Sequence, residues 1–385
     1  MDTTDLLFAL IRSELKGTEI DNEIEDSISM DTLSELYSLS AKHDIAHLLG
    51  ESLSQAGLLT DDKVSEGFRK ATLMAFYRYE RSKYELNRIC EALNNAEIPF
   101  IPLKGAVIRE CYPEPWLRTS CDIDVLIHEE DLGKAVSIFV NEHKYVTDGK
   151  KNYHDISLRS PSGVHLELHF NIKEDIESLD RVLTKVWNNT TVSKDVKYKY
   201  EMTNEFLLFH IVAHLSYHFV NGGCGVRPVI DLWLLENLLS IDKDILNELL
   251  EEASLLQFYE SINELSVVWL NGTKHTDKTR RMEKYILLGG VYGSLQSKVL
   301  VQQQKKQGKV SYFLKRLFPP YSKLKHLYPI ITRHVWLTPF VQIHRWFKIT
   351  FDGRFKRSIK ELSYNKNISK SEAEEMREFL DEIGL

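Results

Sequence analysis

The chain has 385 residues, 43% of them hydrophobic and 27% charged, which is the composition of an ordinary globular protein. At about 150 residues per domain, this length predicts two or three domains. No apolar stretch approaches the roughly 20 residues of a membrane helix, and residues 1–5 are unlike a secretory signal, so we expect a cytoplasmic protein without a membrane span. The four cysteines show no Cys-x-x-Cys spacing, and we expect neither a disulfide nor a zinc finger.

The formal net charge of -7 conceals a basic segment near the end of the chain. Residues 301–360 hold 14 Lys and Arg against one acidic residue, Asp352, a balance of 14 - 1 = +13. This segment is a candidate surface for anions, RNA among them. The alternative is that it only balances the acidic remainder of the chain.

The predicted elements begin with a helical N-terminal region, residues 1–95. From Asp31 to Asn95 apolar residues recur at helical spacing, and no proline interrupts them. The pattern then changes over residues 96–202, where strands and helices alternate and a catalytic domain is expected. There we expect strands at 98–102, 122–127, 155–159 and 164–170, and helices at 106–111 and 132–142.

Residues 203–385 are expected to form a helical domain with a basic, aromatic tail. Helical spacing recurs near residues 203–220, 226–239, 242–257, 258–271 and 276–303. The fold class predicted for the whole chain is therefore α+β, a small mixed sheet flanked by helices with a helical C-terminal lobe.

Asp122 and Asp124 stand in the apolar run 122–127, which suits a buried strand. Side chains two apart on a strand share a face, so both carboxylates project together. Two close carboxylates repel each other unless a cation lies between them. Oxygen ligands of this kind suit Mg²⁺ or Mn²⁺, which often bridge to substrate phosphates.

A third carboxylate, Glu167, lies on the second strand of the expected hairpin, between His165 and His169 at even spacing. If this strand lies beside 122–127, Glu167 joins the two aspartates in a cluster that fits a two-metal mechanism. Glu167 would then be a metal ligand or a base. An exposed strand residue is the alternative.

Basic residues and a glycine precede the aspartates. Lys104 and Gly105 lie where a strand passes into a helix, a place where free backbone N–H groups attract phosphate. Arg118, four residues before Asp122, is a second candidate for binding the triphosphate, although structural Arg–Asp pairs are also frequent.

At this point the chain resembles the nucleotidyltransferase superfamily that shares its catalytic domain with DNA polymerase β, and within it a poorly characterised bacterial group. The matching stretches are 103–106, 112–113, 118–127, 164–169, 210–214 and 227–232, and the likeness covers most of residues 70–330. One difference is that Gly105 is followed by Ala106, where the superfamily usually has Gly-Ser close to its first aspartate.

The resemblance implies transfer of a nucleoside monophosphate from an NTP, most simply ATP, with release of pyrophosphate. It implies a metal held by Asp122, Asp124 and Glu167. Residues that would line the acceptor cleft are His169, His214, Arg227 and Asp231, although Arg227 and Asp231 also fit a helix ion pair. A zinc site made by His210, His214, His218 and Cys224 is a weaker alternative.

Three functions compete on the sequence. The first is an enzyme that moves a nucleotide onto a small molecule, peptide or sugar. The second is an RNA- or protein-modifying nucleotidyltransferase of the toxin type, for which the basic segment would bind RNA. The third is a scaffold that binds nucleotide without catalysis. A metal-dependent nuclease is disfavoured because no Lys follows Glu167 on its strand.

Overall fold

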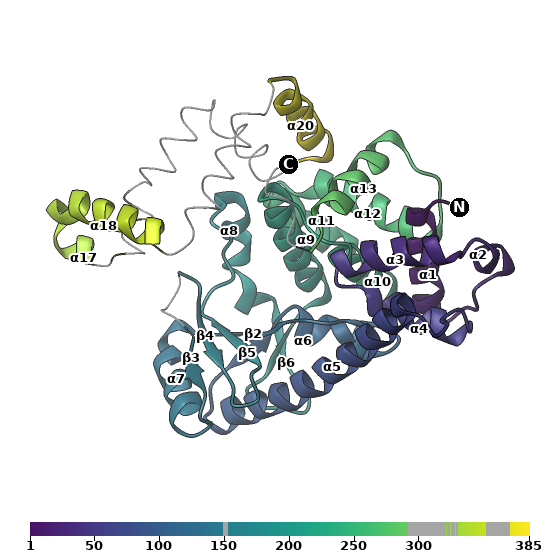
Figure 1. Cartoon of the computed structure of the whole chain (residues 1–385). Coiled ribbons are helices and arrows are strands. Elements are labelled where there is room, and N and C mark those ends of the chain that lie inside the picture. The colour runs from purple at the N-terminus through teal and green to yellow at the C-terminus, as the bar shows by residue number, and fades with distance from the viewer. Residues whose placement is uncertain (149–152, 292–320, 322–323, 325–327, 329, 352–369) are drawn as a thin grey trace.

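The computed structural model of the chain describes residues 1–148, 153–291, 321, 324, 328, 330–351 and 370–385. Its architecture is α+β: a small mixed sheet of five strands is flanked by helices, so the expected fold class is confirmed. Figure 1 shows the sheet beside a larger group of helices, with the long helix α5 (Lys63–Asn95) extending along both.

Four helices precede α5, and most of their starts are encoded locally. The helices are α1 (Thr3–Lys16), α2 (Asn22–Asp26), α3 (Met30–Lys42) and α4 (Ala46–Gln55). Asp2, Asp21 and Ser29 stand before α1, α2 and α3, and Asp62 stands before α5; the side chain of each accepts a hydrogen bond from a backbone N–H group of the first turn, whereas α4 begins without a side-chain cap.

The sheet has the strand order β1-β2-β5-β4-β3. Its strands are β1 (Phe100–Pro102), β2 (Asp122–Ile127), β3 (Val146–Thr147), β4 (Asp155–Arg159) and β5 (His165–His169). All neighbours are antiparallel except β2 and β5, which are parallel. The expected hairpin of β4 and β5 is confirmed, and β5 lies directly beside β2.

The two faces of the sheet belong to different cores. Ile123 and Val125 face a core that includes Phe139 of helix α7 (Leu132–Asn141) and Ile89 of α5. Leu126 faces the other way and is part of the large core of the helical lobe. Because side chains alternate along a strand, Asp122 and Asp124 share the face of Leu126 and point toward the helical lobe.

The helical lobe combines both ends of the described chain. Its C-terminal helices are α9 (Asn204–Val220), α10 (Arg227–Leu238), α11 (Lys243–Glu252), α12 (Leu256–Asn271), α13 (Asp277–Gly289) and α20 (Lys370–Ile383). They share one apolar core with α1, α3 and α4. We propose the division into segments 1–95, 96–202 and 203–385. The hydrophobic cores cross its boundaries: the sheet core includes Ile89 and Leu93 of α5, and the helical core contains residues of both the first and the third segment.

The remaining elements are short or lie toward the end of the chain. They are α6 (Gly105–Ile108), η1 (Arg109–Cys111), η2 (Pro115–Leu117), η3 (Glu129–Asp131), α8 (Glu177–Leu183), η4 (Val186–Asn189), β6 (Thr190–Val192), β7 (Tyr200–Met202), α17 (Ile330–Arg333), η5 (Val335–Leu337) and α18 (Thr338–Phe351). Much of the basic segment 301–360 lies outside the described residues. All four cysteines are free, as expected.

None of the described helices combines the length and the apolar character that crossing a bilayer requires.

Candidate active site

The parallel pairing of β2 and β5 brings the acidic residues together. In this register Asp122 lies opposite His165 and Asp124 lies opposite Glu167. Aligned residues of neighbouring strands point to the same side of a sheet. Asp122, Asp124 and Glu167 therefore project from one face, the face turned toward the helical lobe.

Within the described residues, the possible metal-ligand atoms form two groups. Asp122, His165 and Glu167 make one, and Asp124, Glu167 and His169 make the other, with the atoms of each group within 4.8 Å of one another. Glu167 belongs to both. The three carboxylates thus surround two neighbouring candidate metal positions, and each position also has one histidine nitrogen as a possible ligand.

Asp124 is buried and has two cationic neighbours. Its Oδ1 lies 2.8 Å from His169 Nε2 and 3.5 Å from Lys104 Nζ. Burial by itself would raise the pKa of Asp124, but Lys104 and the hydrogen bond to His169 outweigh it and hold that pKa well below its usual range. Burial also opposes the charge of His169, yet its bonds to Asp124 and Glu167 raise its pKa to about 9.

Asp122 has the opposite electrostatic surroundings. Burial raises its pKa, and the negative charges of Asp124 and Glu167 raise it further. Lys104 and His165 offset this only in part. The face therefore holds one carboxylate that is already paired with cations and one whose charged form would gain from an added cation.

The Lys104-Gly105 turn is tied to β2. The N–H of Leu103 donates to the carbonyl of Asp124 at 3.0 Å, and Lys104 has a φ of 44°, a conformation that costs about 1–3 kcal/mol for a residue with a side chain. Gly105 is required by crowding, because a Cβ there would lie 2.5 Å from Nη1 of Arg118. The turn aims Lys104 at the acidic face, and the space above Gly105 holds the Arg118 guanidinium.

Arg118 forms a buried bidentate pair with Asp231 of α10. Its Nε donates to Oδ1 at 3.0 Å and its Nη2 to Oδ2 at 2.8 Å, and the Tyr112 hydroxyl also donates to Oδ1 at 2.9 Å. Arg227 donates to the carbonyl of Thr119 instead of pairing with Asp231. These contacts join α10 to the loop before β2. Arg227 and Asp231 therefore do not form an ion pair within the helix, and each has a partner that is distant in sequence.

A cavity of about 220 Å³ lies next to the acidic residues. Its lining includes Lys104, Glu167 and His169 from the sheet side and His210 and His214 from α9. Of the four residues expected in an acceptor cleft, His169 and His214 line it, whereas Arg227 and Asp231 do not. Glu167 and His169 belong both to the lining of this cavity and to the acidic site.

Glu174 is a cavity residue that sequence patterns did not single out. It follows β5 in a loop, and its Oε1 lies 2.7 Å from Nδ1 of His214. Nothing in the spacing of residues 171–176 distinguishes it from an ordinary loop acid, because its partner is 40 positions away. Among the residues that the structure describes, His210, His214, His218 and Cys224 do not form a metal-ligand group.

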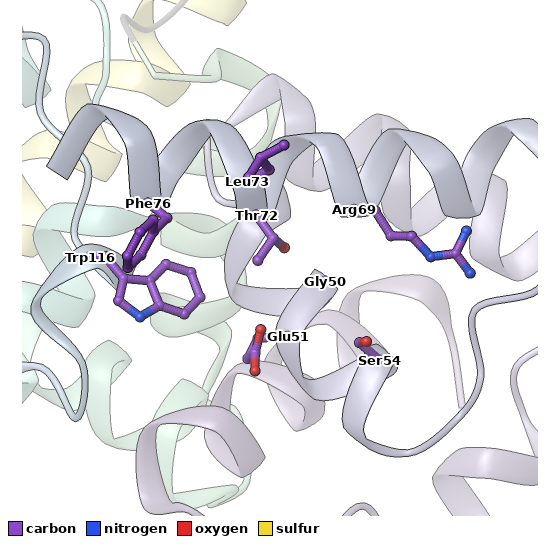
Figure 2. Close-up of a pocket in the computed structure, with 8 residues that line it drawn as sticks. All are labelled: Gly50, Glu51, Ser54, Arg69, Thr72, Leu73, Phe76 and Trp116. Carbon is purple, nitrogen blue, oxygen red and sulfur yellow. The ribbon is translucent and has the colours of Figure 1, made fainter. Parts of the chain in front are cut away.

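A second cavity, of about 370 Å³, lies between α4 and α5. Figure 2 shows Phe76 and Trp116 side by side at one end of it, with Thr72 above Glu51. Its lining includes none of the predicted site residues. The acidic face therefore borders the first of these two cavities and not the second.

Comparison with known proteins identifies the class. The profile of a family described as uncharacterised nucleotidyltransferases matches residues 30–271, and the chain belongs to this family. The match includes the sheet, the acidic face and helices α9 to α12, and it supports nucleotidyl transfer as the function. No curated protein and no solved structure matches the chain.

Proposed function

We propose that this protein transfers a nucleoside monophosphate from an NTP to an acceptor, with release of pyrophosphate, at the face formed by Asp122, Asp124 and Glu167. The observation that supports this most strongly is the parallel register of β2 and β5, which puts three carboxylates on one face beside a cavity. Membership in a nucleotidyltransferase family supports the same reaction.

Asp122, Asp124 and Glu167 would hold divalent metal, Mg²⁺ or Mn²⁺. The donor set fits such an ion, since each of the two ligand groups contains two carboxylates, and Glu167 is shared between them. A bound ion would supply positive charge to the triphosphate and to the leaving pyrophosphate. Asp122, whose charged form is disfavoured in the structure, is the ligand that we expect to respond most to the ion.

Lys104 is proposed to contact the triphosphate. Its ammonium group lies 3.5 Å from Asp124 and interacts electrostatically with Asp122 and Glu167. Lys104 is therefore close to the place where the triphosphate would bind. ATP is the nucleotide that we propose first. Gly105 contributes by letting Arg118 and the turn approach each other closely, and Arg118 contributes by fixing the loop before β2 rather than by a phosphate contact.

The acceptor is proposed to enter the cavity lined by His169 and His214. At about 220 Å³ this cavity is smaller than the roughly 300–1,000 Å³ of pockets that enclose a whole small ligand. It would therefore take one end of the acceptor, which favours a small molecule, sugar or peptide side chain. RNA labelling through the basic segment remains a separate outcome to be tested.

The test is metal-dependent turnover of ATP labelled at its α-phosphorus. Asp122→Asn and Asp124→Asn should abolish pyrophosphate release and weaken Mn²⁺ binding measured by calorimetry. Glu130→Gln removes an exposed acid three residues beyond β2 and should change neither quantity. Undiminished pyrophosphate release by Asp122→Asn would exclude the proposed site, and binding of ATP without any turnover would favour a scaffold.

A further inference from the structure

Three side chains connect the cavity beside the acidic face with the surface. Glu174 Oε1 lies 2.7 Å from His214 Nδ1, and His214 Nε2 lies 3.0 Å from His218 Nε2. The Glu174 side chain is 12% exposed and lines the cavity, whereas His218 is an exposed residue. The hydrogen-bonded path therefore begins at a largely buried carboxylate and ends at solvent.

Glu174 is distinct from the acids that would hold metal. It is in neither of the two metal-ligand groups, although Glu167 and His169 line the same cavity. Glu167 is shared by both groups, so its oxygens are already engaged in the proposed site. Glu174 is the remaining carboxylate of the cavity lining.

The protonation of Glu174 suits proton exchange near neutral pH. Burial raises its pKa to about 7, and nearby positive charges offset that effect only in part. A general base works best when its pKa is close to the pH at which the enzyme operates. The charged or titratable groups that surround Glu174 in the cavity and on the packed elements are Lys104, Tyr153, His154, Glu167, His169, Lys173, Asp175, Asp180, His210, His214, Tyr217 and His218.

Resting on the proposed nucleotidyl transfer, we propose that Glu174 is the general base for an acceptor hydroxyl, and that His214 and His218 exchange the proton with solvent. The acceptor is then an alcohol, such as a sugar or a hydroxyl-bearing side chain, and not a phosphate. A phosphate oxygen is already charged at neutral pH and needs no base.

The step balances without a further reactant. The acceptor oxygen forms a bond to the α-phosphorus as the bond from that phosphorus to the bridging oxygen of pyrophosphate breaks, and the hydroxyl proton passes to Glu174. The carboxylate is regenerated when its proton moves to His214 Nδ1. At the same time the Nε2 proton of His214 passes to His218, and one proton of His218 passes to water. Before the next turnover each imidazole returns to its starting tautomer by exchanging a proton with water, which both side chains can reach.

The first test compares two acceptor probes, glycerol and methyl phosphate, with α-labelled ATP and Mn²⁺. Glu174→Gln should lower labelling of glycerol by roughly 10²- to 10⁴-fold, the usual contribution of a general base, without changing the affinity for Mn²⁺ and ATP. The wild-type profile of kcat/KM should fall on the acid side with a midpoint near pH 7, and Glu174→Gln should remove this limb. Glu177→Gln, an exposed acid three residues later, is the matched control.

His214→Asn keeps a donor near Glu174 but breaks the contact with His218. It should slow glycerol labelling less than Glu174→Gln does. Undiminished labelling by Glu174→Gln, or labelling of methyl phosphate in preference to glycerol, would overturn the inference while leaving the proposed function intact. Loss of the dependence on Asp122 would instead overturn the proposed function.

A measurement without turnover decides the case in which neither probe is labelled. Carbon-13 NMR of the Glu174 carboxyl in the full chain should give a midpoint near 7, and nitrogen-15 signals of His214 and His218 should shift with the same midpoint. In Glu174→Gln the histidine signals should lose this component. A Glu174 midpoint near the ordinary value of about 4.3 would overturn the inference.

Discussion

Asp122 and Asp124 are two positions apart and share a face, yet their neighbours differ. Asp124 is held by Lys104 and His169, whereas Asp122 mainly meets the negative charges of Asp124 and Glu167. One carboxylate is thus neutralised by the protein itself. The charged form of Asp122 would be stabilised by a bound metal cation, which is why we propose Asp122 first as a metal ligand.

Arg118 supplies a stability prediction at the scale of single residues. Arg118→Ala would leave Asp231 buried without its bidentate partner, with only the Tyr112 hydroxyl bond and more distant charges. Breaking a buried pair in this way typically costs about 3–5 kcal/mol. We expect a drop of this size in the free energy of unfolding, measured by urea denaturation.

The matched control for Arg118 is an exposed pair. Arg159 and Asp148 form an ion pair with side chains 51% and 46% exposed, and such surface pairs are worth about 0–1 kcal/mol. Arg159→Ala should therefore change stability little. If Arg118→Ala behaves like Arg159→Ala but weakens ATP binding strongly, Arg118 is a nucleotide ligand and our structural assignment is wrong.

At the scale of elements, the turn that leads into α6 requires a residue without a side chain at position 105, which is Gly105. A Cβ on residue 105 would meet Arg118 Nη1 at 2.5 Å and Ser120 Cβ at 3.1 Å. Gly105→Ala should therefore displace Arg118, weaken its pair with Asp231 and lower the melting temperature. Differential scanning calorimetry would measure the shift.

Gly133 is the control for the same substitution in open space. It lies exposed in α7, and nothing would come within 4 Å of an added Cβ. Alanine is favoured over glycine in a helix interior by about 1 kcal/mol, and Gly133 lies in the first turn, so Gly133→Ala should raise the melting temperature slightly. Equal shifts in the two variants would refute the explanation by crowding.

For the whole molecule, the last helix is expected to be part of the helical core. Phe379 of α20 is 4% exposed, with its ring centroid 6.2 Å from that of Phe219 and 5.6 Å from that of Tyr285. Phe379→Ala should cost about 3–5 kcal/mol of unfolding free energy. Glu374→Ala, on an exposed position of the same helix, should cost little. A small effect of Phe379→Ala would show that α20 does not dock in solution.

Buried histidines should make the helical lobe sensitive to acid. Burial lowers the pKa of His43 and of His47 to about 4. In the unfolded chain both take up a proton near pH 6.5, so the unfolded state binds more protons between about pH 6.5 and 4. Stability is therefore fully present above pH 6.5 and is lost as the pH falls through this window.

The measurement is unfolding free energy at several pH values. His47→Gln can keep a donor near the Leu117 carbonyl, which lies 2.7 Å from His47 Nε2, and it should reduce the slope between pH 6.5 and 4. The reduction should be at most about 1.4 kcal/mol per pH unit. His334→Gln, at an exposed position, should leave the slope unchanged. If His47→Gln leaves the slope between pH 6.5 and 4 unchanged, protonation of His47 does not cause the loss of stability in acid.

Much of this protein follows from its sequence alone. Helical spacing predicted the helical regions, and the alternation in residues 122–127 put Asp122 and Asp124 on one face of a strand. The hairpin of β4 and β5 likewise follows from its turn. These features could be predicted because they depend on residues that are close together in the chain.

Only the tertiary structure decided what surrounds the acidic face. The parallel pairing of β2 with β5 aligned Asp124 with Glu167, and the docking of α9 brought His214 to Glu174. The pairing of Arg118 with Asp231, 113 positions away, likewise depends on the tertiary structure. Local sequence patterns do not encode such contacts, because they depend on how distant segments pack to bury their apolar faces together.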